Sequence, residues 1–184
     1  PNFNFIGQNI FPYKICDNHV PSLCDTALVF VNVTAACTFT PTVNDPADQV
    51  LCNGNPTAAV NFSGTPVGVM FSWTNNNTSI GLAASGTGNI PSFTAINNGT
   101  APVVATIIVT PSYLSGQLTC LGTPQTFTIT VNPTPNVAQP ANQEVCSGNL
   151  TNAVNFTSTV PGTVFNWTNS NTSIGLGASG SGNI

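Results

Sequence analysis

The residues that could carry out chemistry in this sequence are few and scattered. The chain of 184 residues holds one basic residue, Lys14, five acidic residues and one histidine, His19. Catalysis needs a positioned acid, base or nucleophile. His19 lies in a short segment between two cysteines, with no nucleophile pattern around it, and Asp45 and Asp48 are the only carboxylates in residues 41–134. The sequence therefore predicts a protein that is not an enzyme and has no catalytic residue.

Cysteine is the remaining reactive residue type, with six copies. No CxxC pair exists and only one histidine is present, so a zinc-type ligand set is not expected. The Gly-rich segment 85–89 lacks the lysine of a phosphate-binding loop, and a turn explains it better. We expect no metal and no cofactor. Disulfides formed in an oxidising compartment are the favoured state of the cysteines.

The composition excludes several classes of protein. Charged residues make up only 3% of the chain, and nucleic-acid binding depends on many Lys and Arg contacts to phosphate, so no nucleic-acid partner is expected. No apolar run approaches the roughly 20 residues of a membrane span. A net charge of −4 and a mean hydropathy of +0.20 argue against disorder. Abundant Thr, Asn, Gly and Pro favour short strands joined by tight turns.

An internal repeat decides the domain organisation. Residues 41–90 align without a gap to residues 135–184 at a constant offset of 94, and 31 of the 50 pairs are identical. A period of this length is the size of a small domain rather than of a solenoid unit. We expect one complete repeat over 41–134 and the N-terminal half of a second copy over 135–184. Residues 1–40 do not fit the repeat and are interpreted as the C-terminal strands of a preceding domain, so the chain is expected to begin and end inside domains.

Alternating patterns predict the strands of the complete repeat. Strands are expected over 58–62, 69–73, 103–109 and 126–131, and a further one over 27–33 in the first segment. The last strand of the repeat places Phe127, Ile129 and Val131 on one face and threonines on the other. No segment has helical periodicity, and Pro133-Thr134-Pro135 ends the strand. The fold class predicted is all-β: tandem immunoglobulin-like β-sandwiches arranged as beads on a string.

The motifs of the repeat resemble a known family. Val50-Leu-Cys-Asn-Gly54, Phe71-Ser-Trp-Thr74, Gly86-Thr-Gly-Asn-Ile-Pro-Ser-Phe93 and Thr126-Phe-Thr-Ile-Thr-Val-Asn-Pro-Thr-Pro135 are similar to the PKD-like and immunoglobulin-like domains of very large surface proteins of Bacteroidetes-type bacteria. Residues 1–34 resemble the end of a cadherin-like or bacterial Ig-like repeat, on Tyr13-Lys-Ile-Cys-Asp-Asn18 and Pro21-Ser-Leu-Cys-Asp-Thr-Ala27. The resemblance implies a secreted adhesin, including the gliding-motility type. Calcium, which cadherin-like relatives hold with acidic clusters, is not expected here because acidic residues are so few.

Disulfides and structural residues complete the expected sites. Cys16 is expected to pair with Cys24 and close a hairpin loop, and Cys52 is paired with Cys120 because both lie in the complete repeat. Cys146, the equivalent of Cys52, would then need a partner near position 214, while for Cys37 a free thiol, an inter-domain bond and an inter-chain bond all stay open. Three further residues are assigned a role from the pattern: Trp73 and Trp167 as core residues, with sugar stacking as the alternative, and Thr26 as an O-glycosylation acceptor in Asp25-Thr26-Ala27.

Three functional hypotheses follow. The first is an extracellular spacer or filament shaft at a bacterial cell surface, whose partners are neighbouring domains of the same chain. Because few charges protect its strand edges, this segment is also expected to self-associate into fibres. The second is a carbohydrate- or surface-binding module with a glycan ligand. The third is an accessory domain of a secreted enzyme.

Overall fold

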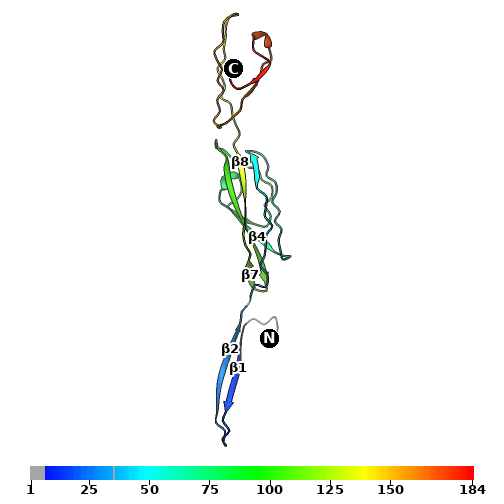
Figure 1. Ribbon diagram of the computed structural model, residues 1–184, viewed down its shortest axis with the longest axis vertical. Coiled ribbons are helices and arrows are strands. Elements are labelled where there is room, and N and C mark those ends of the chain that lie inside the picture. Colours follow the sequence, from blue (N-terminus) through cyan, green and yellow to red (C-terminus); the bar gives the residue numbers. More distant parts are fainter. Residues whose placement is uncertain (1–6, 35) are drawn as a thin grey trace.

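The computed structural model describes residues 7–34 and 36–184, so the first six residues of the expected N-terminal segment lie outside it. Its three parts follow one another along the longest axis of the molecule (Figure 1). An N-terminal hairpin leads to a central β domain, and residues 135–184 follow at the opposite end. Among the described residues the regular elements are ten strands and two short 3-10 turns, which confirms the all-β class.

The N-terminal hairpin consists of β1 (Gly7–Cys16) and β2 (Cys24–Val33), which pair antiparallel over their full length. The strand expected over 27–33 is therefore the second half of β2. Nearly every residue of the hairpin is exposed. A two-stranded ribbon with both faces in water is marginally stable by itself. The stability of the hairpin therefore depends on how it is linked to the rest of the chain.

One sheet organises the central domain. It consists of β3 (Gln49–Cys52), β4 (Met70–Asn75), β5 (Ser85–Thr87), β6 (Val103–Ser115), β7 (Leu118–Leu121) and β8 (Gln125–Asn132). The strand order is β3-β8-β6-β4-β5, and β7 pairs with the end of β6. The strands expected over 103–109 and 126–131 lie within β6 and β8, and most of the strand expected over 69–73 lies within β4. All neighbours are antiparallel except β3, which runs parallel to β8.

The second layer of the sandwich is irregular, and the strand expected over 58–62 is wrong. Its segments are joined by two isolated bridges, Pro56 to Thr94 and Val60 to Ile90, and by scattered backbone hydrogen bonds. Side-chain amides supplement these backbone bonds. The Gln49 amide donates to the carbonyl of Ala58 and accepts from its N–H, at 3.1 and 2.9 Å. This use of amide side chains explains why so polar a sequence can fold with few regular strands.

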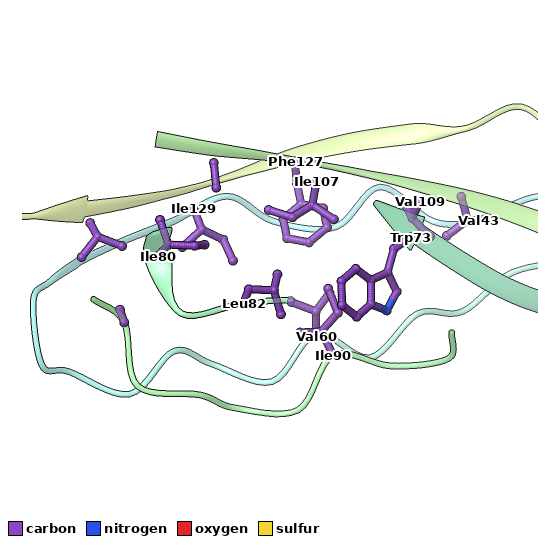
Figure 2. Close-up of a cluster of buried hydrophobic side chains, with 13 residues drawn as sticks. Val43, Val60, Trp73, Ile80, Leu82, Ile90, Ile107, Val109, Phe127 and Ile129 are labelled. Atoms are coloured by element: carbon purple, nitrogen blue, oxygen red, sulfur yellow. The ribbon is translucent and has the colours of Figure 1, made fainter. Parts of the chain in front are cut away.

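The core lies between these two layers (Figure 2). From the sheet, the inward side chains of β6 and β8 are almost completely buried, and Trp73 enters from β4. From the second layer come side chains such as Val60, Ile80, Leu82 and Ile90, which face the sheet in the close-up. The alternation expected for Phe127, Ile129 and Val131 is present, since these three are at most 2% exposed while their threonine neighbours point outward.

Residues 135–184 reproduce the local contacts of the first half of the central domain. Gln143 bonds the backbone of Asn152 as Gln49 bonds that of Ala58. The short strands β9 (Asn166–Thr168) and β10 (Ser179–Ser181) pair as β4 and β5 do. No strand forms over 143–146, the equivalent of β3, because β3 exists by pairing with β8 and the segment has no such neighbour.

Candidate functional site

The loop at the end of the hairpin contains the histidine and holds no catalytic arrangement. His19 Nδ1 lies 3.3 Å from Asp17 Oδ2, and the histidine side chain is 84% exposed. The nearby Ser22 hydroxyl donates to the backbone carbonyl of Asp17 at 3.0 Å, so it is not activated by the imidazole. Asp17 also accepts from the backbone N–H groups of His19 and Leu23. The carboxylate therefore orders the loop.

The cysteines pair differently from the expected pattern. Cys16 and Cys24 form the expected bond across the end of the hairpin. Cys120 is bonded to Cys37, which makes the predicted Cys52–Cys120 pair wrong. The parallel pairing of β3 with β8 is the reason. Cys52 lies opposite Asn132, twelve positions beyond Cys120, which at about 3.3 Å per residue separates the two cysteines by roughly 40 Å. A disulfide needs Cα atoms within about 7 Å.

The Cys37–Cys120 bond joins the segment after the hairpin to the central domain. Its Cα atoms are 5.7 Å apart and 83 positions separate the two residues. Cys120 is buried at the end of the sheet nearest the hairpin, where β7 pairs with the last residues of β6. Of the three alternatives open for Cys37, the structure supports the inter-domain bond. The position equivalent to Cys37 in the repeat is Val131, so this bond has no counterpart at the next junction.

Two cysteines remain as exposed thiols. Cys52 ends β3, at the end of the domain opposite to Cys120, and Cys146 is its equivalent 94 positions later. Because Cys52 does not pair with Cys120, the argument that Cys146 requires a partner near position 214 no longer holds.

Trp73 belongs to the interior rather than to a sugar-binding surface, and Trp167 is partly covered. Trp73 is 7% exposed, and Gly86 on the neighbouring strand lies so close to the indole that a β-carbon there would overlap it. Trp167 has the same relation to Gly180 but is only half-buried. Both indole nitrogens lack a hydrogen-bond partner within the described part of the chain. The Gly partner in each repeat is a packing residue that the sequence analysis did not identify.

The end of the central domain nearest residues 135–184 is fixed by asparagines. Asn97, 4% exposed, donates to the carbonyls of Val131 and Ala101 and accepts from the N–H of Gly99. Asn53 donates from its side chain to Thr134 Oγ1 at 3.2 Å, which ties the start of the next segment to this end. These buried or partly buried amides were missed from the sequence because asparagine is so abundant that no single one stood out.

A cavity of about 560 Å³ lies at the same junction. Its lining includes Pro102, Pro133, Pro135, Val160 and Pro161, and no titratable side chain takes part. Such an apolar, proline-lined hollow offers no group for chemistry. Proline fixes backbone φ, so these residues restrict the angle between the two parts.

Elsewhere, the described residues offer no obvious ligand-binding chemistry. No group of three or more His, Cys, Asp or Glu side chains gathers in residues 7–34 and 36–184. No helix among them is long and apolar enough to span a membrane. Thr26 is exposed on β2, where a modifying enzyme could reach it, and its glycosylation stays a prediction.

Comparison with known proteins finds a family match over the central domain. Residues 47–135 match the family model of the PKD-like domain. The match covers all six strands of the central sheet and ends where the second repeat begins. A search of curated proteins found no match to the chain. PKD-like domains are typically non-catalytic, and such a domain is consistent with an extracellular structural or adhesive module.

Proposed function

We propose that this chain is an extracellular structural segment that acts as a spacer or filament shaft in a long bacterial surface adhesin. The observation that carries the proposal is the end-to-end order of the hairpin, the PKD-like domain and the second repeat along one axis (Figure 1). Two disulfides fit an oxidising, extracellular environment. The parent protein and its attachment to the cell surface are part of this proposal.

Both junctions restrain bending, which a spacer requires. On one side the Cys37–Cys120 bond anchors the segment leading from the hairpin. On the other, Pro133, Pro135 and the Asn53–Thr134 hydrogen bond restrict the path into the second repeat. A near absence of charge also means that the shape depends little on salt.

Small-angle X-ray scattering tests the extended shape. Each residue of a strand rises about 3.3 Å, so the ten residues of β2 and the thirteen of β6, together with the second repeat, give a length of roughly 100 Å. A rod of that length has a radius of gyration of about 29 Å. A compact protein of this length would have a value of about 16 Å. As a comparison, replacing Pro133-Thr134-Pro135 by Gly-Ser-Gly should lower the radius of gyration and widen the distribution of conformations. A parent value near 16 Å would contradict the spacer function.

The glycan-binding alternative loses its main support. The burial of Trp73 removes the aromatic platform on which the PKD-like domain could have stacked a sugar. Binding on a glycan array that is lost when an exposed hairpin aromatic such as Tyr13 is replaced by alanine would revive this alternative.

A further inference from the structure

Cys120 is bonded to a cysteine of the part of the chain that precedes its own repeat. Its partner, Cys37, lies before Pro41, where the repeat begins. Cys120 is 2% exposed and lies at the end of the sheet nearest the hairpin. Cys52, the other cysteine of the same repeat, lies at the opposite end of that sheet. A cysteine at this position therefore reaches the part of the chain before its repeat, and it does not reach the second cysteine of its own repeat.

Cys52 lies at the start of the next junction. It pairs with Asn132 in the parallel ladder of β3 and β8, where neighbouring strands are about 4.8 Å apart. Asn53 extends this contact, because its N–H donates to the Asn132 carbonyl at 2.8 Å and its side-chain amide donates to Thr134 Oγ1 at 3.2 Å. At the offset of 94 between the repeats, Asn132 corresponds to the residue that follows Cys37. Cys52 is therefore placed before the second repeat much as Cys37 is placed before the first.

The two repeats also begin along the same local backbone path. The N–H of Asn44 donates to the carbonyl of Ser63 at 2.8 Å. The equivalent residues of the second repeat, Ala138 and Thr157, form the same hydrogen bond at 2.9 Å. Because this bond fixes how the incoming chain lies against each repeat, equivalent positions just before the two repeats are expected in similar places.

We propose that Cys52 of one repeat forms a disulfide with the Cys120 of the repeat that follows it. The Cys37 bond itself is not repeated at this junction, because Val131 occupies the equivalent position, and Cys52 on the neighbouring strand supplies a thiol instead. The recurrence of Cys52 as Cys146 extends the same link to the next pair of repeats. The inference rests on the proposed spacer function and deepens it by naming the bond that joins one repeat to the next.

The reaction is the oxidation of two thiols by a disulfide oxidant such as oxidised glutathione. The thiolate of Cys52 attacks one sulfur of the oxidant, whose S–S bond breaks and releases one reduced thiol. The thiolate of the following repeat's cysteine then attacks the Cys52 sulfur of this mixed disulfide and releases the second reduced thiol. One S–S bond forms in the protein, two electrons pass to the oxidant, and the two thiol protons end on its leaving groups. An oxidising extracellular compartment maintains such a bond.

Disulfide mapping of a chain with two complete repeats tests the proposal. Residues 91–134 can be added a second time after Ile184, which places a copy of Cys120 at position 214. After oxidation with glutathione, non-reducing peptide mapping should recover position 214 linked to Cys52. Alkylation of the folded, unreduced chain should then add one adduct, on Cys146, whereas three adducts are expected if the new bond does not form.

Cys52→Ser and Cys146→Ser are matched variants of the two-repeat chain, since each removes an exposed thiol at an equivalent position. Cys52→Ser should abolish the new bond and leave position 214 as a thiol, while Cys146→Ser should leave the bond intact. Slower hydrogen exchange at Val154 and Ile184 checks that the added strands complete the second repeat. A bond from position 214 to Cys146, or a free thiol at position 214 in the completed repeat, would overturn the proposal.

The 184-residue chain gives a second test that does not depend on added strands. In Cys37→Ser, Cys120 loses its partner, so Cys120 and Cys52 are both thiols of one repeat. The proposal requires that they stay unbonded in single chains under the same oxidation, because they lie at opposite ends of the sheet. An intramolecular bond between them would overturn it. If the two-repeat chain lacks the new bond but is still extended in scattering, the covalent link is refuted and the spacer function stands.

Discussion

Ile80 and Ile174 provide an internal test of how the two repeats differ. Each ends a 3-10 turn whose asparagine, Asn77 or Asn171, accepts from a serine N–H at 3.1 Å. Each turn is closed by a glycine in the left-handed region, at φ of 95° and 90°. The local structure is therefore the same, and the two isoleucines differ only in their tertiary contacts. Ile80 is 0% exposed and Ile174 is 70% exposed.

Replacing each isoleucine by alanine should therefore have unequal effects. Alanine removes three carbon groups, worth about 0.8 kcal/mol each when fully buried, or about 2.4 kcal/mol. At Ile80 the cavity left behind adds to this, giving a loss of about 3–4 kcal/mol. At Ile174 less than a third of the side chain is covered, so the loss should be about 0.7 kcal/mol or less.

Native-state hydrogen exchange can measure both losses on equivalent amides. Val60 and Ile90 exchange backbone hydrogen bonds of 2.9 and 3.0 Å, and Val154 and Ile184 form the same pair in the second repeat. Ile80→Ala should speed exchange at the first pair by more than a hundredfold, since 1.4 kcal/mol corresponds to about tenfold. Ile174→Ala should speed exchange at the second pair by about threefold.

Two results would refute this reasoning. An acceleration below about tenfold at Val60 and Ile90 would mean that Ile80 is not part of the core that stabilises the domain. Equal large accelerations in both repeats would mean that Ile174 is covered as Ile80 is, so that its observed exposure would be wrong. The measurement should be made at a concentration where sedimentation finds single chains.

Three further predictions concern packing, polar burial and cysteine. Gly86→Ala should destabilise the PKD-like domain by about 1–3 kcal/mol in urea titrations, because the new methyl group overlaps the Trp73 indole; Gly177→Ala, whose nearest neighbour is 3.9 Å away, should be neutral, and equal losses would contradict the close-packing argument. Asn97→Ala should cost about 1–3 kcal/mol in the same assay, since it leaves the Val131 and Ala101 carbonyls without their donor; no change would contradict their dependence on Asn97. Alkylation of the folded, unreduced chain should add two adducts by intact mass, on Cys52 and Cys146, and labelling of Cys120 instead would overturn the observed pairing.

The sequence predicts the strands that carry strong alternation and the side chains that they turn inward. Phe127, Ile129 and Val131 could be placed because a buried sheet face requires period-two alternation. The strand expected at 58–62 failed because only Val60 pairs with another backbone segment, while the N–H groups of Ala58 and Phe62 donate to side-chain amides of Gln49 and Asn89, which no periodicity reveals. The first strand of the hairpin was missed because Pro12 interrupts its pattern.

The disulfide error has a different origin. Membership of one repeat says that two cysteines share a domain, and it leaves open which ends of the strands they occupy. That information lies in the parallel pairing of β3 with β8, a contact between segments far apart in the sequence. Ile80 and Ile174 are identical residues in the same local turn, and they differ in exposure because β6 and β8 cover Ile80 alone.

The pairing of β3 with β8 also bears on how the PKD-like domain acquires its structure. Asp48, next to β3, accepts a hydrogen bond from the N–H of Thr128 across 80 positions of sequence. The first strand of the sheet, β3, is thus stabilised by pairing with the last, β8. Almost the whole domain must therefore be present before either strand can pair. A chain emerging N-terminus first would hold an unfinished, aggregation-prone intermediate until β8 arrives, and then fold in one cooperative step. High contact order of this kind predicts slow folding, on a timescale of milliseconds to seconds.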